Sequence, residues 1–178
     1  MVFSSCTTRF LKKMIVFDDI NTRAESFQTD RFAAIRDCVE SWNNRCSSVL
    51  VCGDYVAIDE CLYSFRNQLG FKVYNPNKPG KYGINVKCLN EVVFPFTYRC
   101  EFFAGKPLVT EGAQYYVPST HDVTLRLMDR FGWPKLAGCN LTCYNLYTSI
   151  PLAEHMLQKK MTLVGTMRSN RRGLNKTR

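Results

Sequence analysis

A carboxylate closes an apolar segment of the sequence at Asp59, where the chain reads Ala57-Ile58-Asp59-Glu60. Enzymes that cut phosphodiester bonds commonly place two divalent cations beside the scissile phosphate, where the cations stabilise the attacking and leaving oxygens. Magnesium prefers hard oxygen ligands, chiefly carboxylates, and in such sites these converge from the ends of different elements. Asp59 is therefore a candidate metal ligand. The alternative is a solvated turn, which is the more common role of an Asp-Glu pair after a strand.

A second position with potential chemistry lies in residues 141–152, which read LTCYNLYTSIPL. The pattern predicts the end of a strand, a short turn, and a helix that begins at Thr148 or Ser149 with Pro151 in its first turn. Side chains at strand-to-helix junctions often point into active sites, and Tyr144 occupies this junction. A phenol is neutral at pH 7 and is a poor ligand for magnesium. The junction therefore offers no carboxylate to complement Asp59.

Other metal chemistry finds little support in the sequence. The nine cysteines are scattered without a CxxC pair, and only two histidines are present. Tetrahedral zinc sites need closely spaced ligand pairs, so we predict no metal site. Cys139 and Cys143 are the nearest cysteines along the chain, and we expect them to be small buried thiols.

Length and composition predict an ordinary soluble domain. The chain has 178 residues, of which 46% are hydrophobic and 22% are charged, values typical of one folded domain with a sizeable core. No apolar run approaches the roughly 20 residues of a membrane span, and the N-terminus lacks the pattern of a secretory signal. We therefore expect no membrane partner and a location in the cytosol or nucleus.

The net charge of +9 suggests an acidic partner. Lys72, Lys78, Lys81 and Lys87 occur in a stretch without any acidic residue, and a second basic cluster lies at the C-terminus. The members of this cluster are Arg168, Arg171, Arg172, Lys176 and Arg178. Such a balance suits contact with phosphate backbones. The alternative is a solvated basic surface that keeps the protein soluble.

The elements that must position these residues follow from periodicity and turn signals. We expect, in order, a helix from about 22 to 47, a strand at 55–65, strands at 84–94 and 97–105 that form a hairpin, a helix at 120–131, a strand at 139–143, a helix at 149–159 and a strand at 161–167. The first helix carries an apolar stripe typical of a core face, formed by Phe32, Ile35, Val39, Trp42 and Cys46. Thr120 is the expected cap of the second helix, and Gly132 is its expected stop.

This order of elements predicts an α/β fold with a mixed sheet flanked by helices. One fold with this order is the ribonuclease-H-like sheet. We expect the folded domain to span residues 17–168. Residues 1–16 are predicted to be a poorly defined leader, and residues 169–178 are predicted to be a basic tail.

Four segments together resemble a known family. They read AIDECLYSFR, YNPNKPGKYGINVK, YNLYTSIPLAEHML and TLVGTMRSNRR, and they occur in this order with sensible gaps. They are similar to the transposase domain of the piggyBac family, which occurs in transposons and in host genes derived from them. The segment FDDINTRAESFQTDRFAAIRD is similar to the part that precedes the catalytic core in that family. The resemblance covers roughly residues 17–175.

The resemblance implies a ribonuclease-H-like core with three essential aspartates and a divalent metal such as magnesium, which together nick and transfer transposon ends. The first aspartate matches Asp59, and the position of the second is occupied by Tyr144. The third is expected on a later helix downstream of Arg178, and the family's cysteine-rich zinc module is absent, so the domain is predicted to be C-terminally incomplete. Glu91 is expected to be an exposed strand end rather than a substitute ligand. We therefore predict an inactive transposase without a cofactor.

Three functional hypotheses remain. The first is non-specific contact with DNA backbone phosphates by a domain that no longer cleaves. Its expected contact residues are Lys72, Lys78, Lys81, Arg168, Arg171 and Arg172. The second is an interaction module that binds a full-length transposase or a host protein. The third is a relic gene product without a selected function. We expect the protein in the nucleus, with the cytoplasm as the alternative.

Overall fold

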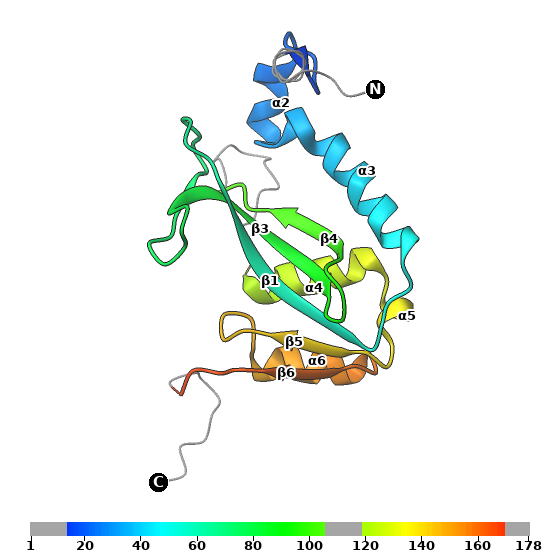
Figure 1. The fold of residues 1–178 in the computed structure, drawn as a ribbon. Coiled ribbons are helices and arrows are strands. Elements are labelled where there is room, and N and C mark those ends of the chain that lie inside the picture. The colour runs from blue at the N-terminus through cyan, green and yellow to red at the C-terminus, as the bar shows by residue number, and fades with distance from the viewer. Residues whose placement is uncertain (1–13, 106–118, 170–178) are drawn as a thin grey trace.

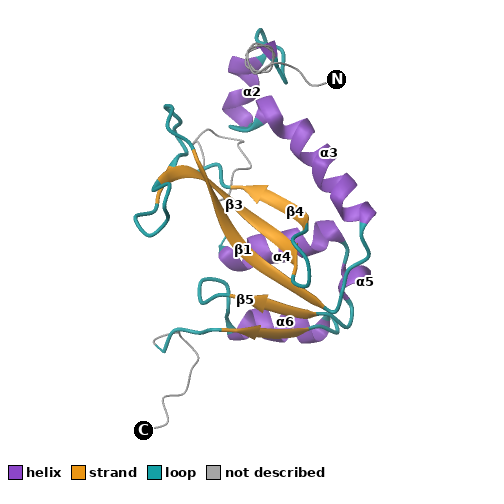
Figure 2. Ribbon diagram, viewed as in Figure 1, coloured by secondary structure: helices purple, strands orange, loops and turns teal. Residues whose placement is uncertain are grey.

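The computed structural model describes residues 14–105 and 119–169, which form one mixed sheet with helices against one face and along one edge (Figures 1 and 2). The elements in chain order are α2 (Arg23–Thr29), α3 (Ala33–Val49), β1 (Tyr55–Ser64), β2 (Val73–Tyr74), β3 (Tyr82–Glu91), β4 (Thr97–Phe102), α4 (Thr120–Phe131), α5 (Trp133–Leu136), β5 (Asn140–Cys143), α6 (Ile150–Gln158) and β6 (Thr162–Gly165). Within the described ranges, no helix has the length and apolar character needed to cross a membrane.

The sheet has six strands in the order β2-β3-β1-β5-β6, and β4 also pairs with β3. Strand β1 runs antiparallel to β3 and parallel to β5, and β5 runs parallel to β6. The predicted hairpin of β3 and β4 is present. Strand β2, which the sequence did not predict, pairs with the start of β3. The mixed arrangement confirms the predicted α/β architecture.

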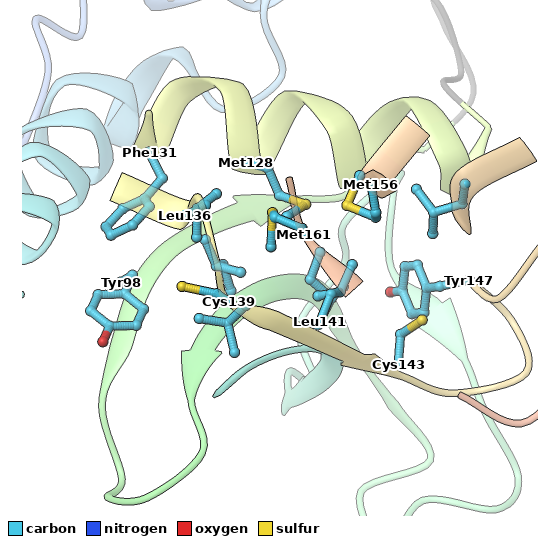
Figure 3. Close-up of a cluster of buried hydrophobic side chains, with 14 residues drawn as sticks. Tyr98, Met128, Phe131, Leu136, Cys139, Leu141, Cys143, Tyr147, Met156 and Met161 are labelled. Atoms are coloured by element: carbon cyan, nitrogen blue, oxygen red, sulfur yellow. The ribbon is translucent and has the colours of Figure 1, made fainter. Parts of the chain in front are cut away.

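The main core lies between the sheet and the helices α4, α5 and α6 (Figure 3). Alternation along β1 turns Val56 and Ile58 toward these helices, and both side chains are fully buried. Phe131 of α4 packs against Tyr98 of β4, with their ring centroids 4.9 Å apart. Full burial of an apolar side chain of this size contributes about 1.5 to 3 kcal/mol to folding. The apolar face of the sheet therefore anchors the helices that follow it in sequence.

Local signals fix the ends of α4 and α6. Ser119, rather than the predicted Thr120, caps α4: its hydroxyl accepts the N–H of Asp122, and the Asp122 carboxylate accepts the N–H of Ser119. This capping box satisfies main-chain donors that a helix start leaves free. Helix α4 stops at Gly132 as predicted, where φ is 113°. Ser149 caps α6 within the predicted start of that helix.

The single helix predicted at 22–47 is in fact two helices, α2 and α3. Asp30 separates them, and its main chain is extended with φ −138° and ψ 113°. The Asp30 carboxylate accepts the N–H of Phe32 at 2.8 Å and pairs with Arg36 at 2.6 Å. An aspartate that bonds to nearby main-chain groups competes with helical hydrogen bonds. The apolar stripe of the predicted helix begins only at Phe32, after this break, so the stripe does not reveal the interruption.

The predicted core stripe of α3 is wrong in part. Phe32 is buried, but Trp42 is 45% exposed, and the buried residues within α3 are the polar Asn43 and Ser47. Both polar side chains form hydrogen bonds with the main chain of β4. Strand β4 pairs with β3 along one edge and, among the described strands, has no partner along the other. Helix α3 therefore packs along this open edge through polar groups, which satisfy main-chain atoms that would otherwise lack partners.

The apolar stripe of α3 instead borders an open groove of about 450 Å³ between this helix and the sheet. Ile35, Val39 and Trp42 contribute to its helix side. Its sheet side is formed by Tyr63, Val86, Cys88, Thr97, Cys100 and Phe102. We call it the apolar groove. It lies on the sheet face opposite the main core, and Figures 1 and 2 show no described helix over β1 and β5 on that face.

Candidate functional site

Parallel pairing of β1 with β5 ends beside Asp59 and Tyr144. The last register pair of the two strands is Ile58 with Cys143. Asp59 and Tyr144 are the next residues along each chain segment, so they flank each other at one end of the paired strands. In α/β folds, ligands commonly bind at the carboxyl ends of neighbouring parallel strands. We therefore take this position as the candidate site.

Asp59 points to the sheet face opposite the main core. Ile58 and Glu60 face the helices, and side chains alternate along a strand. Asp59 is half-buried, and its Oδ1 accepts the N–H of Glu60 at 2.7 Å. Its register partner on β3 is Cys88, which lines the apolar groove. The carboxylate therefore lies on the open side of the sheet.

Glu60 is held on the helix side. Its Oε1 accepts the hydroxyl of Tyr147 at 3.1 Å, and Tyr147 is only 2% exposed. Burial, together with the adjacent Glu60 carboxylate, raises the pKa of Tyr147, so its hydroxyl stays protonated and donates. Lys87 lies opposite Glu60 on β3. Because these partners fix Glu60 on the helix side, it does not converge with Asp59 on one site.

Tyr144 organises the turn through its main chain. Its carbonyl oxygen accepts the N–H groups of Tyr147 and Thr148, at 2.9 and 3.1 Å, and the Thr148 hydroxyl at 3.0 Å. These bonds shape the turn that leads from β5 into α6. The side chain of Tyr144 is 63% exposed. The phenol therefore projects into solvent at the position beside Asp59.

Glu91 is not the exposed strand end that the sequence predicts, because its side chain is 6% exposed. The carboxylate accepts hydrogen bonds from the Tyr98 hydroxyl and from the main-chain N–H groups of Gly53, Val92 and Val93. Burial on its own raises the pKa of this carboxyl group, but the four donors outweigh burial and lower the pKa of Glu91. Glu91 thus has a structural role that ties three chain segments together.

Residues near Asp59 do not supply the donor set of a two-cation site. Within 14–105 and 119–169, no group of three or more His, Cys, Asp or Glu side chains is placed to hold a metal ion. The residues that directly follow the paired ends of β1 and β5 supply one carboxylate, Asp59, and one phenol, Tyr144. Two divalent cations need several carboxylate oxygens between them. The described residues at this position therefore do not, by themselves, fit a pair of metal ions.

Three of the predicted contact cations gather beyond the ends of β1 and β3, in a segment that we call the basic lobe, residues 65–82. The basic lobe holds Arg66, Lys72, Lys78 and Lys81 and no acidic residue. It lies at the left of Figure 1. Arg66, Lys78 and Lys81 are exposed, and Lys72 is half-buried. The sequence prediction omitted Arg66, which the fold brings into the same lobe.

Cations of the basic lobe have no carboxylate partners, in contrast to five arginines elsewhere in the described chain. Five arginines outside the lobe form ion pairs with nearby carboxylates: Arg23, Arg36, Arg99, Arg126 and Arg130. No ion pair in the described part of the chain involves a cation of the basic lobe. The positive charge of the lobe is therefore left uncompensated by neighbouring side chains.

Arg168 lies apart from the basic lobe. It is exposed and follows β6 by three residues. Because β6 runs parallel to β5, Arg168 lies beyond the same strand ends as Tyr144. Arg171 and Arg172 fall outside the described residues.

Cys139 and Cys143 are buried thiols, as predicted. Burial raises the pKa of both. The Cys139 thiol donates to the carbonyl oxygen of Gly53 at 3.1 Å and lies 3.8 Å from the Cys52 sulfur. These contacts and the burial of both thiols indicate that the two cysteines are packing residues.

Comparison with known proteins identifies the family and the fold of the chain. A family model described as Transposase IS4 matches residues 8–177, and the chain belongs to this transposase family. The chain is also similar to the protein in a cryo-EM structure of a piggyBac transposase synaptic complex with hairpin DNA, with 32% sequence identity and a TM-score of 0.79. The match covers 93% of this chain and 34% of that chain, so this chain spans about a third of the transposase. Comparison with curated proteins gives no match.

These matches confirm the predicted resemblance and the predicted fold. The chain carries a piggyBac-type transposase domain with a ribonuclease-H-like mixed sheet flanked by helices. In this fold the strand that carries Asp59 is the central one of the sheet, and the strand that ends before Tyr144 is its parallel neighbour.

Sequence reasoning missed three side-chain pairs around the site: Glu60 with Tyr147, Glu91 with Tyr98, and Tyr74 with Tyr82. The first two pairs join residues that come together only through the pairing and register of the strands, so the sequence carries no local signal for these contacts. The third had a signal, because Tyr74 and Tyr82 flank a turn rich in proline, asparagine and glycine. A strand on each side of such a turn places the flanking residues opposite each other.

Proposed function

We propose that this chain is a transposase-derived domain that contacts DNA through backbone phosphates and does not cleave it. The observation that carries the proposal is the basic lobe, with four cations, no acidic residue and no ion pair. Such contacts are electrostatic and largely independent of base sequence. The related piggyBac transposase was solved in a complex with hairpin DNA, which supports nucleic acid as the partner. A nuclear location accompanies this role.

The absence of cleavage is proposed from the chemistry beside Asp59. The position next to Asp59 holds the phenol of Tyr144, and Glu60 is bonded to Tyr147 on the opposite face. A single carboxylate leaves two divalent cations without the ligands that the two-cation mechanism requires. We therefore propose that the domain binds DNA without cleaving it.

The test is the salt dependence of affinity for duplex DNA of about 20 base pairs, measured by fluorescence anisotropy between about 50 and 200 mM salt. We expect measurable binding at low salt. In a plot of the logarithm of the binding constant against the logarithm of the salt concentration, the slope should become more negative by about 0.9 for each phosphate contact. The variant with Lys72→Gln, Lys78→Gln and Lys81→Gln should bind more weakly and with a shallower slope.

A matched control removes the same amount of charge elsewhere, through Arg45→Gln, Lys159→Gln and Lys160→Gln. These cations lie outside the basic lobe, and the control should retain most of the affinity. The proposal fails if the wild-type chain does not bind duplex DNA at low salt, or if its affinity is insensitive to salt. It also fails if the two triple variants lose the same affinity.

The apolar groove favours a second candidate, an interaction module for a related transposase chain or a host protein. Trp42, at its border, is 45% exposed, and Tyr63 is 60% exposed. Exposed apolar surfaces of this kind favour association. Co-purification with a full-length relative, abolished by Trp42→Asp and retained by Arg45→Gln on the exposed side of the same helix, would support this candidate. Retention by both variants would contradict it.

A further inference from the structure

Two tyrosines face each other across the base of the basic lobe. Tyr74 of β2 and Tyr82 of β3 are register partners, and their ring centroids are 4.7 Å apart with an interplanar angle of 38°. A cross-strand aromatic pair helps to hold a short strand such as β2 in place. That role does not require exposed rings, yet Tyr74 is 55% exposed and Tyr82 is 50% exposed. About half of the surface of each side chain is therefore available to a ligand.

One cation lies over this aromatic pair, and two more occur in the turn that connects the two strands. The Lys72 Nζ lies 5.4 Å from the ring centroid of Tyr82, within the range of a cation–π contact. Lys78 and Lys81 belong to the turn that joins the two strands, and no acidic residue occurs in the basic lobe. Aromatic rings set among uncompensated cations are the combination that binds single-stranded nucleic acids, because bases stack on the rings and phosphates contact the cations.

The register of the sheet places the pair on the same face as Asp59. Tyr82 is an even number of positions from Val86 and Cys88 on β3, so its side chain points to the same face as theirs. Val86 and Cys88 line the apolar groove, and Cys88 is the register partner of Asp59. Tyr82 lies six positions along β3 from Cys88, which corresponds to about 20 Å at the rise of a β-strand. Tyr63, 60% exposed, is on this face between them. A strand bound at the pair and running toward Asp59 would pass over Tyr63.

We propose that Tyr74 and Tyr82 form a stacking site for unpaired nucleobases, flanked by phosphate contacts from Lys72, Lys78 and Lys81. The ligand class is single-stranded nucleic acid, or a duplex with unpaired bases at its end. This inference rests on the proposed function for its electrostatic component. It adds a preference for unpaired bases, which phosphate contacts alone do not give.

The experiment compares two single strands of about 16 nucleotides, one with normal bases and one with a central run of abasic sites. Both strands carry the same phosphates, so the difference in affinity reports contacts with bases. We expect the base-bearing strand to bind roughly 5- to 30-fold more tightly to the wild-type chain. DNA and RNA versions of the same sequence distinguish the two natural sources of this ligand.

Two double variants separate stacking from structural support. Tyr74→Phe with Tyr82→Phe keeps both aromatic faces and should keep the preference for the base-bearing strand. Tyr74→Leu with Tyr82→Leu keeps apolar bulk, and it should bind both strands with the affinity that the wild-type chain shows for the abasic strand. Its affinity for duplex DNA should stay close to that of the wild-type chain, which shows that the fold and the cations are intact.

Photocrosslinking with a halogenated uracil in the single strand locates the contact. We expect the crosslinked peptide to contain Tyr74 or Tyr82. Equal affinity of the wild-type chain for the two strands, or an unchanged preference in the leucine variant, would overturn the stacking site while leaving phosphate binding in place. Loss of binding to every nucleic acid, duplex included, would instead overturn the proposed function.

Discussion

Asn43 of α3 forms two hydrogen bonds with the main chain of Cys100 in β4: its Nδ2 donates to the carbonyl oxygen at 3.0 Å, and its Oδ1 accepts the N–H at 2.8 Å. The amide thus occupies the place of a neighbouring strand at the edge of the sheet. Asn43 is 1% exposed, so water does not replace these bonds readily. Asn43 therefore helps, together with Ser47, to fix the long helix α3 along the edge of β4.

We expect Asn43→Ala to lower the free energy of unfolding by about 1 to 3 kcal/mol, because it leaves a main-chain donor and acceptor without partners. Urea denaturation followed by circular dichroism measures this loss. Ser41→Ala on the exposed side of the same helix is the control and should change stability by less than about 0.5 kcal/mol. Equal effects of the two substitutions would show that the Asn43 bonds do not stabilise α3.

The burial of Asn43 also shows which feature of α3 the sequence does not predict. The periodic positions Ile35, Val39 and Trp42 predict a helix correctly, because spacing reports local conformation. They predict its buried side wrongly, because burial depends on what the rest of the chain places beside the helix. In this fold the neighbour is an edge strand with unpaired main-chain groups, so polar residues are the buried ones.

The candidate site likewise has a part that the sequence predicts and a part that it does not. Asp59 and Tyr144 could be placed from local patterns, since each follows an apolar strand segment. Glu60 and Tyr147 are separated by 87 positions, and their contact exists only because β1 pairs with β5. The Glu60 side chain points to the helix side of the sheet because side chains alternate along a strand. The Asp-Glu pair in the sequence does not by itself indicate which of the two residues points to that side.

The Glu91 carboxylate should make part of the free energy of unfolding sensitive to acid. Its pKa is lowered in the folded chain, so it contributes stability above the unfolded pKa near 4.5 and loses that contribution as pH falls through the folded value. Glu91→Gln should cost about 1.5 to 3 kcal/mol at pH 7, because charge-assisted hydrogen bonds become neutral ones. The cost should shrink as pH falls below 4.5.

Chemical denaturation at neutral and acidic pH measures this difference, with Glu154→Gln as the control on the exposed side of α6. The control should follow the pH dependence of the wild-type chain. If Glu91→Gln gives the same loss at acidic and neutral pH, then the Glu91 carboxylate is not the titrating group.

Gly83 of β3 fits so closely against β1 that a side chain there must displace main chain. A Cβ atom at this position would lie 2.2 Å from the carbonyl oxygen of Tyr63. We expect Gly83→Ala to destabilise the chain by about 1 to 3 kcal/mol and to weaken the pairing of β3 with the end of β1. Because Gly83 is also the register partner of Val73, the basic lobe should loosen with it.

Gly70 gives a matched comparison, since a Cβ atom there meets no atom within 4 Å. Gly70→Ala should be neutral or slightly stabilising, by up to about 1 kcal/mol, because it restricts the unfolded chain. Thermal unfolding and amide hydrogen exchange of residues 73–83 measure both effects. Similar exchange rates in the two variants would contradict the close packing of Gly83.

Tyr144→Asp tests the chemistry of the candidate site directly. The side chain is 63% exposed, and the turn is held by the carbonyl oxygen of residue 144, so we expect a change in stability below about 0.5 kcal/mol. Two carboxylates would then flank each other at the paired ends of β1 and β5. We expect the variant to gain weak binding of Mn²⁺, seen as a cation-dependent rise in Tm that the wild-type chain lacks.

We do not expect this substitution to create a nuclease. Glu60 remains bonded to Tyr147 on the helix side, so the two neighbouring carboxylates would hold one cation rather than the two that flank a scissile phosphate. Incubation of supercoiled DNA with Mn²⁺ and the variant should leave the DNA intact. Asp59→Asn in the Tyr144→Asp background should abolish the cation-dependent rise in Tm. Nicking that disappears on Asp59→Asn would show that one carboxylate pair is sufficient, and that Tyr144 alone blocks cleavage.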